Sequence, residues 1–307
     1  MDMRRAGSWL LLVTLATLAL LACRNETVQK PTPTTATSTP SARVDPPAPA
    51  LASAAAREPA LMPATIDSSP RPIGPYELPF LGKRNVYFVV PSSRAKPQRL
   101  VANLHGMCNP PGYACGLWKN AASQIGFLVC PTGNASCGPA MYDAPTWTES
   151  VPKMDEDLER AIAVVMEQYP DEVSREAAVL TGFSRGAFAA PEIAKMHAGR
   201  WPFLVLNEAN VALDARALRK AGVRAVALIA GEKGSNVPGN RATVAQLTKA
   251  GFPARLWIMP GAGHYYSNDI DQIMTDAIAW VTANGGGGEG GDAGVERADG
   301  GDGRDGG

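Results

Sequence analysis

The sequence has little of what marks several large classes of protein. Its 29 Lys and Arg residues balance 29 Asp and Glu residues, so no basic field is predicted to attract nucleic acid. None of its five cysteines forms the tight Cys-x-x-Cys pair of a structural zinc site. It has three histidines, so chemistry that needs an imidazole base has few candidates. Gly and Pro are plentiful but concentrate towards the two ends, which predicts a compact middle between extended flanks.

The first residues are typical of a secretion signal. Arg4-Arg5 precedes an apolar run from Leu10 to Leu21, which is shorter than the ~20 residues that a membrane-spanning helix needs. The run ends in Leu20-Leu21-Ala22-Cys23, which resembles the lipobox of bacterial lipoproteins. That resemblance implies cleavage after residue 22 and lipid attachment at Cys23, with Arg24 favouring the outer membrane. An ordinary secretion signal is the alternative, so we expect a protein of the cell envelope or a secreted one.

Composition divides the rest of the chain into three parts. Residues 23–71 are rich in Pro, Thr and Ala, with too few large apolar side chains to offset the entropy of ordering, so we expect a disordered tether. Residues 285–307 are rich in Gly and Asp and are expected to form a disordered tail. Residues 72–284 remain as one domain, which we expect to be a monomer.

Within this domain, short apolar runs alternate with helical patterns. Strands are expected at 85–90, 99–105, 126–131, 177–181, 203–207, 225–230 and 255–259. Helices are expected at 117–124, 154–169, 186–197, 214–220, 241–250 and 269–283. This alternation predicts an α/β fold with a mostly parallel central sheet and helices on both faces.

Four cysteines lie within the domain. An even number in an exported protein predicts two disulfides. The equal spacing within each pair favours Cys108–Cys115 and Cys130–Cys137, although four cysteines allow three connectivities.

Ser184 lies where an apolar strand is followed by a helix. The stretch Gly182-Phe183-Ser184-Arg185-Gly186 matches Gly-x-Ser-x-Gly, the nucleophile elbow, whose tight turn admits only glycine two residues before and after the serine. A serine hydroxyl is a poor nucleophile unless a base takes its proton. His264, in the loop between the last strand and the last helix, is the expected base. His105 is expected to stabilise a turn, and His197 to act as a charge partner at the end of its helix.

From Tyr76 to Ala283 the chain resembles an α/β-hydrolase. The resemblance rests on His105-Gly106-Met107 at the end of the strand expected at 99–105, the serine pentapeptide after the strand at 177–181, and Gly261-Ala262-Gly263-His264 after the strand at 255–259. It implies the α/β-hydrolase fold, here without a large cap domain. It also implies an oxyanion hole made by the backbone N–H of Arg185 and that of Met107 or Gly106.

The acid of the triad is where the sequence departs from this family. The family commonly has Gly-x-x-Asp after the strand that corresponds to residues 225–230, whereas Gly231-Glu232-Lys233-Gly234 has glycine in the aspartate position. Glu232 is the nearest carboxylate and is the expected acid. Glu208, which follows the strand expected at 203–207, is the alternative, and a third possibility is that neither carboxylate serves.

These residues predict a serine hydrolase that cleaves carboxylic esters, of small molecules or polymers, through an acyl-enzyme and without a metal or organic cofactor. Trp118, Tyr142 and Trp147 are expected to line its substrate pocket; the alternative is that they pack the disulfide-linked loops. Three other functions stay open: a serine peptidase of this fold, a polymer esterase, and a non-catalytic envelope lipoprotein that uses the fold for binding.

Overall fold

The computed structural model of the protein describes residues 71–140, 144–148 and 150–285. The expected signal peptide, Cys23, nearly all of the expected tether, the tail beyond Gly285 and Tyr142 lie outside the described residues. Among the helices that are described, none combines the length and the apolar character needed to cross a membrane.

The domain contains ten strands and six helices within the described ranges. The strands are β1 (Tyr76–Leu81), β2 (Arg84–Val89), β3 (Gln98–Leu104), β4 (Gly126–Pro131), β5 (Ala135–Ser136), β6 (Pro145–Thr146), β7 (Val173–Phe183), β8 (Phe203–Asn207), β9 (Ala225–Gly231) and β10 (Ala254–Met259). The helices are α1 (Pro111–Ser123), α2 (Val151–Gln168), α3 (Arg185–Met196), α4 (Ala215–Lys220), α5 (Asn236–Lys249) and α6 (Ile270–Asn284). Each expected strand and helix overlaps one of these elements. Strand β1 was not expected, because it is a half-exposed edge strand whose sequence carries little apolar alternation.

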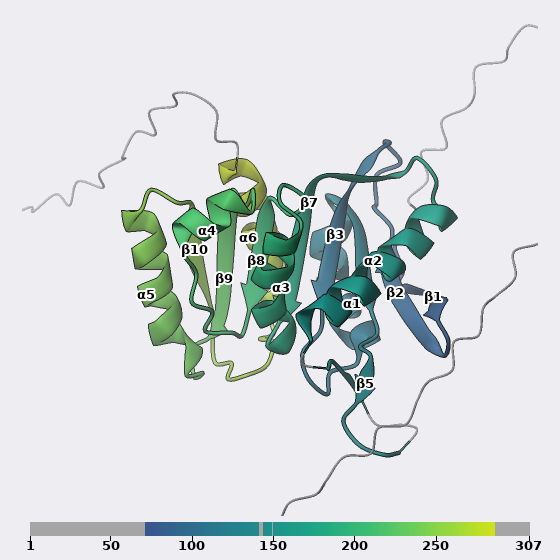
Figure 1. Ribbon diagram of the computed structural model, residues 1–307, viewed down its shortest axis with the longest axis horizontal. Coiled ribbons are helices and arrows are strands. Elements are labelled where there is room, and N and C mark those ends of the chain that lie inside the picture. The colour runs from purple at the N-terminus through teal and green to yellow at the C-terminus, as the bar shows by residue number, and fades with distance from the viewer. Residues whose placement is uncertain (1–70, 141–143, 149, 286–307) are drawn as a thin grey trace, which may run out of the picture. The chain divides into compact units, whose positions relative to one another are not determined.

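Eight strands form one sheet in the order β1-β2-β4-β3-β7-β8-β9-β10 (Figure 1). Strand β2 pairs antiparallel with both β1 and β4, and all the other neighbours in this sheet are parallel. The apolar run of β9 is buried at every position, as a strand covered on both faces requires. This is the mostly parallel α/β-hydrolase architecture that the sequence predicted.

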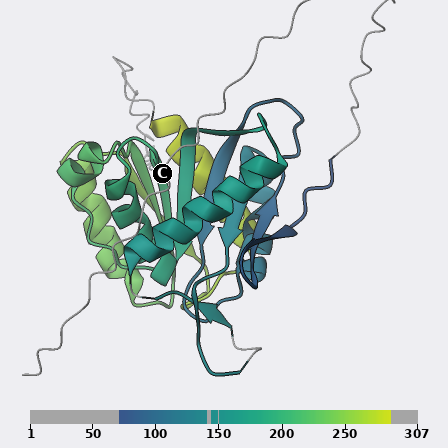
Figure 2. The same cartoon turned by 45° about the vertical axis from the view of Figure 1, so that its right-hand side comes forward.

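Two hydrophobic cores lie on opposite faces of the sheet. Helices α1 and α6 bury Trp118, Met274 and Ile278 against one face. Helices α2 to α5 cover the other face, where Leu158 and Ile193 are fully buried. Figure 1 shows α3 and α5 in front of the sheet, and Figure 2 shows α2 running across the same face with α6 behind. The sheet is therefore held rigidly between two layers, which fixes the positions of its strand ends.

Two disulfides join the first half of the domain, and both predicted pairings are wrong. Cys115 bonds to Cys130 and Cys108 bonds to Cys137, with Cα–Cα distances of 5.9 and 5.6 Å. Cys115 lies on α1, which packs directly on β4 and so faces Cys130. Cys108 precedes α1 and meets the loop that contains β5. Spacing along the chain did not reveal this packing of helix on strand, so it selected the wrong partners.

The loops that leave the parallel strands meet at one edge of the sheet, because parallel strands end on the same side. His105 follows β3, Ser184 follows β7, and Glu208 follows β8. Glu232 follows β9, and His264 lies in the loop after β10. The candidate residues from five separate segments therefore share one edge.

Candidate functional site

Ser184 is the turn residue between β7 and α3. Its backbone is in the left-handed region, at φ 50° and ψ −114°, a conformation that costs a non-glycine residue on the order of 1–3 kcal/mol. A Cβ on Gly182 would lie 2.4 Å from the carbonyl carbon of Gly186, and a Cβ on Gly186 would lie 1.9 Å from the Leu104 oxygen. Both flanking positions therefore require glycine. The strain at Ser184 is held by the packing of the turn against β3.

The imidazole of His264 lies against the serine. Its Nε2 is 3.0 Å from Ser184 Oγ, which is hydrogen-bonding distance. The ring of Phe183 contacts the imidazole with a centroid distance of 5.2 Å. The His264 side chain is 56% exposed, so a substrate can reach the serine–histidine pair from solvent.

Glu208 holds the other side of that imidazole. His264 Nδ1 is 3.1 Å from Glu208 Oε2, and the glutamate side chain has no exposed surface. The Asn236 side-chain amide donates to Oε2 at 3.1 Å, and the backbone N–H of Gly231 donates to Oε1. A buried carboxylate with these donors has a fixed position, so it fixes the tautomer of His264, with Nδ1 protonated and Nε2 left to face the serine.

The predicted order of the two carboxylates is reversed. Glu232 is exposed, and its carboxylate accepts the backbone N–H of Gly261 at 2.8 Å rather than approaching His264. Gly234, in the position where the resemblance implies an aspartate, faces the Glu208 carboxylate, and a Cβ there would lie 3.6 Å from Oε2. Glu208, which follows β8, therefore lies next to the position where the family has its aspartate.

The loop after β3 lies directly beside the serine. A Cβ on Gly106 would lie 3.3 Å from the Cβ of Ser184, so the backbone at 106 and the serine are in close contact. The next residue, Met107, forms part of the pocket wall and is 63% exposed. Arg185 is the first residue of α3 and directly follows the serine. The structure thus brings Gly106, Met107 and Arg185, the residues predicted for an oxyanion hole, close to Ser184.

His105 fixes the start of this loop and does not face the pocket. Its Nδ1–H donates to the Gly106 oxygen at 2.7 Å, and its Nε2 accepts the backbone N–H of Gly133 at 2.9 Å. Trp147 stacks on the imidazole at 4.8 Å and donates to the His105 oxygen at 2.9 Å. Burial lowers the pKa of His105 to about 4, so the ring is neutral when it makes these bonds. This arrangement agrees with the predicted structural role of His105.

A pocket of about 350 Å³ opens beside the serine and the histidine. It is lined by Met107, Cys108, Asn109, Pro110, Tyr113, Phe183, Ser184, His264, Tyr265 and Tyr266. The prediction that Trp118 and Trp147 line the pocket is wrong, because both side chains are buried in the protein interior. Trp118 instead packs behind the wall, where its Nε1 donates to the Tyr266 hydroxyl at 3.5 Å. Their burial supports the alternative, that these aromatics pack the loops.

The aromatic residues that do line the pocket were missed in the sequence. Tyr265 and Tyr266 directly follow His264, and this adjacency was the signal that could have identified them. Tyr113 gave no such signal, because only the packing of α1 brings it to the site. Tyr266 is held against Phe183 with ring centroids 4.6 Å apart, and burial raises the pKa of its hydroxyl.

His197 does not belong to the site. It is the C-terminal cap residue of α3, and its Nε2 is 2.7 Å from Asp155 on α2, so it links two helices as a charge partner. Over the described ranges, no cluster of His, Cys, Asp and Glu side chains is placed to hold a metal ion.

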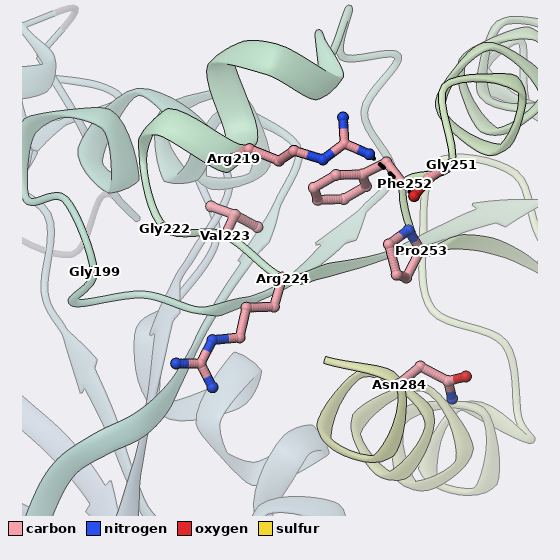
Figure 3. Close-up of a pocket in the computed structure, with 9 residues that line it drawn as sticks. All are labelled: Gly199, Arg219, Gly222, Val223, Arg224, Gly251, Phe252, Pro253 and Asn284. Atoms are coloured by element: carbon pink, nitrogen blue, oxygen red, sulfur yellow. Dashed lines mark hydrogen bonds between the residues drawn. The ribbon is translucent and has the colours of Figure 1, made fainter. Parts of the chain in front are cut away.

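A separate pocket of about 480 Å³ lies at the other end of the strands, near the residues that precede β9 and β10 (Figure 3). Arg219 donates to the Ala250 and Gly251 oxygens there and stacks near Phe252. Arg224 extends away from this group in the figure. The residues lining this pocket include no serine, histidine or carboxylate, so the chemistry-bearing residues belong to the edge that contains Ser184.

Comparison with known proteins finds similarity at the level of structure. No family model matches the chain, and no curated protein sequence matches it. Among solved structures, it is similar to the fluorophosphonate-binding serine hydrolase F of Staphylococcus aureus (15% identity, 67% of this chain and 96% of that chain, TM-score 0.49). It is also similar to esterase PE8 (19%, 68% and 100%, 0.49) and to an esterase of Pyrobaculum calidifontis (13%, 68% and 85%, 0.49).

Proposed function

We propose that this protein is a serine hydrolase that cleaves carboxylic esters through an acyl-enzyme, with Ser184 as nucleophile, His264 as base and Glu208 as acid. The observation that carries the proposal is the continuous hydrogen-bonded chain from Ser184 Oγ to His264 Nε2 and from His264 Nδ1 to Glu208 Oε2. This chain supports the proposal because acyl transfer by a serine requires a base beside the hydroxyl and a group that orients the base.

In the proposed first step, His264 Nε2 accepts the hydroxyl proton while Ser184 Oγ bonds to the ester carbonyl carbon. The Glu208 carboxylate stabilises the imidazolium that forms, because it lies against the protonated Nδ1. The carbonyl oxygen gains the negative charge, and the backbone N–H groups of Arg185 and Met107 are its proposed donors. The tetrahedral intermediate collapses as His264 passes its proton to the departing alcohol, which leaves an ester of Ser184.

In the second step, His264 takes a proton from a water molecule, and the resulting hydroxide attacks the acyl-enzyme. Collapse of the second intermediate returns the proton to Ser184 and releases the carboxylic acid. Each step uses only groups that lie at this edge of the sheet, namely Ser184, His264, Glu208 and the two backbone donors.

The position of Glu208 also bears on the non-catalytic alternative. The main support for that alternative was the absence of an aspartate after β9, which left the base without an evident partner. A buried carboxylate beside His264 removes that support. Catalysis is therefore the function that the geometry favours.

A fluorophosphonate probe tests the proposal directly, because it phosphonylates a serine only where the serine is activated. We expect intact-mass spectrometry to show one adduct on the wild-type domain, mapped to Ser184, and none on Ser184→Ala. His264→Ala should react at least 10³-fold more slowly. Absence of an adduct on folded wild-type protein, with no hydrolysis of p-nitrophenyl acetate, would reject the enzyme and favour the binding module.

We further propose that the protein is exported and anchored to the envelope by lipid at Cys23. The two disulfides of the domain support export, since such bonds form and persist in oxidising compartments. Palmitate incorporation in cells should depend on Cys23, and the Cys23→Ala variant should leave the membrane fraction. Labelling that survives this substitution would contradict the anchor.

A further inference from the structure

We propose that the substrate is an uncharged ester that carries one aromatic ring within a few bonds of the scissile carbonyl. The inference rests on the proposed function and concerns what the pocket beside Ser184 accepts. Three features of this pocket support the inference: its wall is aromatic, the described residues of the wall carry no formal charge, and the pocket is small.

Aromatic rings surround the nucleophile on several sides. Tyr113 comes from the first turn of α1, Phe183 precedes the serine, and Tyr265 and Tyr266 follow the histidine. Tyr266 packs on Phe183, and its hydroxyl accepts a hydrogen bond from Trp118 Nε1, so these two rings are held in place. Rings in such a wall favour a ligand that carries a ring, because stacked or edge-on contacts between two rings add binding free energy beyond that from burying apolar area.

The mouth of this pocket is where large apolar side chains are most exposed. Met107, Tyr113 and Tyr265 are 63, 59 and 57% exposed, the three highest values among the large hydrophobic side chains of the described residues. The Tyr265 hydroxyl donates to the Gly261 oxygen at 3.1 Å, which holds the ring in place without a substrate. Exposed apolar area that gathers around a nucleophile, rather than being spread over the surface, marks a site that a ligand covers.

The described residues of the wall carry no fixed charge. No Lys, Arg, Asp or Glu is among the ten described residues that line the pocket. Glu208 is fully buried behind His264, and the Arg185 guanidinium is directed to the Thr148 oxygen at 3.4 Å. A carboxylate or phosphate on the substrate would find no cation here, and an ammonium group would find no anion. The pocket therefore suits a neutral ester.

The size of the pocket limits how many rings the substrate can place in it. Its volume of about 350 Å³ is near the lower end of the range for small-molecule sites, which runs from roughly 300 to 1,000 Å³. One ring and a short linker fit this space, whereas a long acyl chain would extend beyond the aromatic wall.

The test compares esters whose carbonyl reactivity is matched. Methyl 3-phenylpropionate and methyl hexanoate place the ring or the alkyl chain in the acyl part, and 2-phenylethyl acetate and hexyl acetate place it in the alcohol part. In the two aromatic esters, methylenes separate the ring from the reacting bond, so the ring does not change the electronic character of the carbonyl. We expect kcat/KM to be about 3- to 10-fold higher for the aromatic member of at least one pair, mainly through KM. The pair that shows the preference identifies which half of the ester enters the pocket.

Substitutions at Tyr113 assign the preference to the wall. Tyr113→Leu replaces the ring with an aliphatic side chain and should reduce the preference to below about 2-fold, whereas Tyr113→Phe should retain it. Phe188→Leu is the matched control, since Phe188 is an exposed aromatic residue on α3 that does not line the pocket, and it should change nothing. Equal or higher kcat/KM for both aliphatic esters, or a preference that survives Tyr113→Leu, would overturn the inference. Fluorophosphonate labelling of Ser184 in the same preparations shows whether the proposed function still holds.

Discussion

Replacing Glu208 by glutamine is the sharpest perturbation of the proposed triad. The carboxylate has two oxygens and three donors: Gly231 N–H on Oε1, and Asn236 and His264 on Oε2. A glutamine amide has one oxygen and one NH₂ group, so it cannot accept all three bonds. If NH₂ faces His264, the imidazole adopts the wrong tautomer and places Nε2–H towards Ser184. If NH₂ faces Gly231, a buried N–H loses its acceptor.

The two orientations have different costs. In a Ser-His-Asp protease, the wrong tautomer of the triad histidine lowers kcat by about 10⁴-fold. An unsatisfied buried donor lowers the free energy of unfolding by about 1–3 kcal/mol. For Glu208→Gln we expect kcat to fall by about 10³- to 10⁴-fold, which corresponds to about 4–5 kcal/mol of barrier. We also expect the free energy of unfolding to fall by about 1–3 kcal/mol.

Glu232→Gln is the matched control, because it is the same substitution one strand further along the sheet. Its carboxylate accepts only an exposed backbone N–H, so kcat should change by less than about 3-fold. The assay is steady-state hydrolysis of p-nitrophenyl acetate, with urea denaturation to establish that each variant is folded. A large loss in Glu232→Gln together with near-normal turnover in Glu208→Gln would refute the assignment of the acid.

Three further perturbations follow from the same geometry. Replacing both Cys108 and Cys137 with serine should lower the free energy of unfolding by about 3–4 kcal/mol and should also lower kcat, because Cys108 is in the pocket wall. Replacing both Cys115 and Cys130 with serine should lower Tm and leave kcat unchanged. Equal kcat in the two double variants would contradict this. His105 has a pKa of about 4 when folded against 6.5 as a free side chain, so its contribution to stability is complete above pH 6.5 and is lost as the pH falls to 4. Between pH 6.5 and 4, the free energy of unfolding measured by urea titration should therefore fall by about 3 kcal/mol less in His105→Gln than in the wild type. The same pH dependence in both proteins would count against a neutral buried ring. Gly186→Ala should give little folded protein and no fluorophosphonate adduct, because its Cβ would lie 1.9 Å from the Leu104 oxygen; a normal yield of active protein would disprove the tight turn.

The parts of the site that could be predicted from the sequence are those with local causes. The elbow around Ser184 is set by two glycines within the same pentapeptide; Gly182 is required by a contact within the turn, and Gly186 by the close approach of the turn to Leu104 on β3. His264 was identified because a mostly parallel sheet brings all its loops to one edge, and few histidines were available. Periodicity and sheet topology were sufficient for both.

The parts that could not be predicted depend on side chains that meet only after packing. Glu208 adopts φ 55° immediately after β8, and nothing in its neighbours along the chain indicates that it is directed inward towards Gly231. The disulfide partners were hidden because α1 had to be packed on β4 before Cys115 could face Cys130. Composition alone did not distinguish the buried Trp118 from the exposed aromatic residues of the pocket.

The most direct measurement of the central claim is a crystal structure of the domain after reaction with a methyl phosphonofluoridate. The account predicts phosphorus bonded to Ser184 Oγ, with the phosphonyl oxygen about 3 Å from the backbone nitrogens of Arg185 and of Met107 or Gly106, and His264 still between the adduct and Glu208. Phosphorus on another residue, or on a serine whose phosphonyl oxygen faces away from both nitrogens, would contradict it.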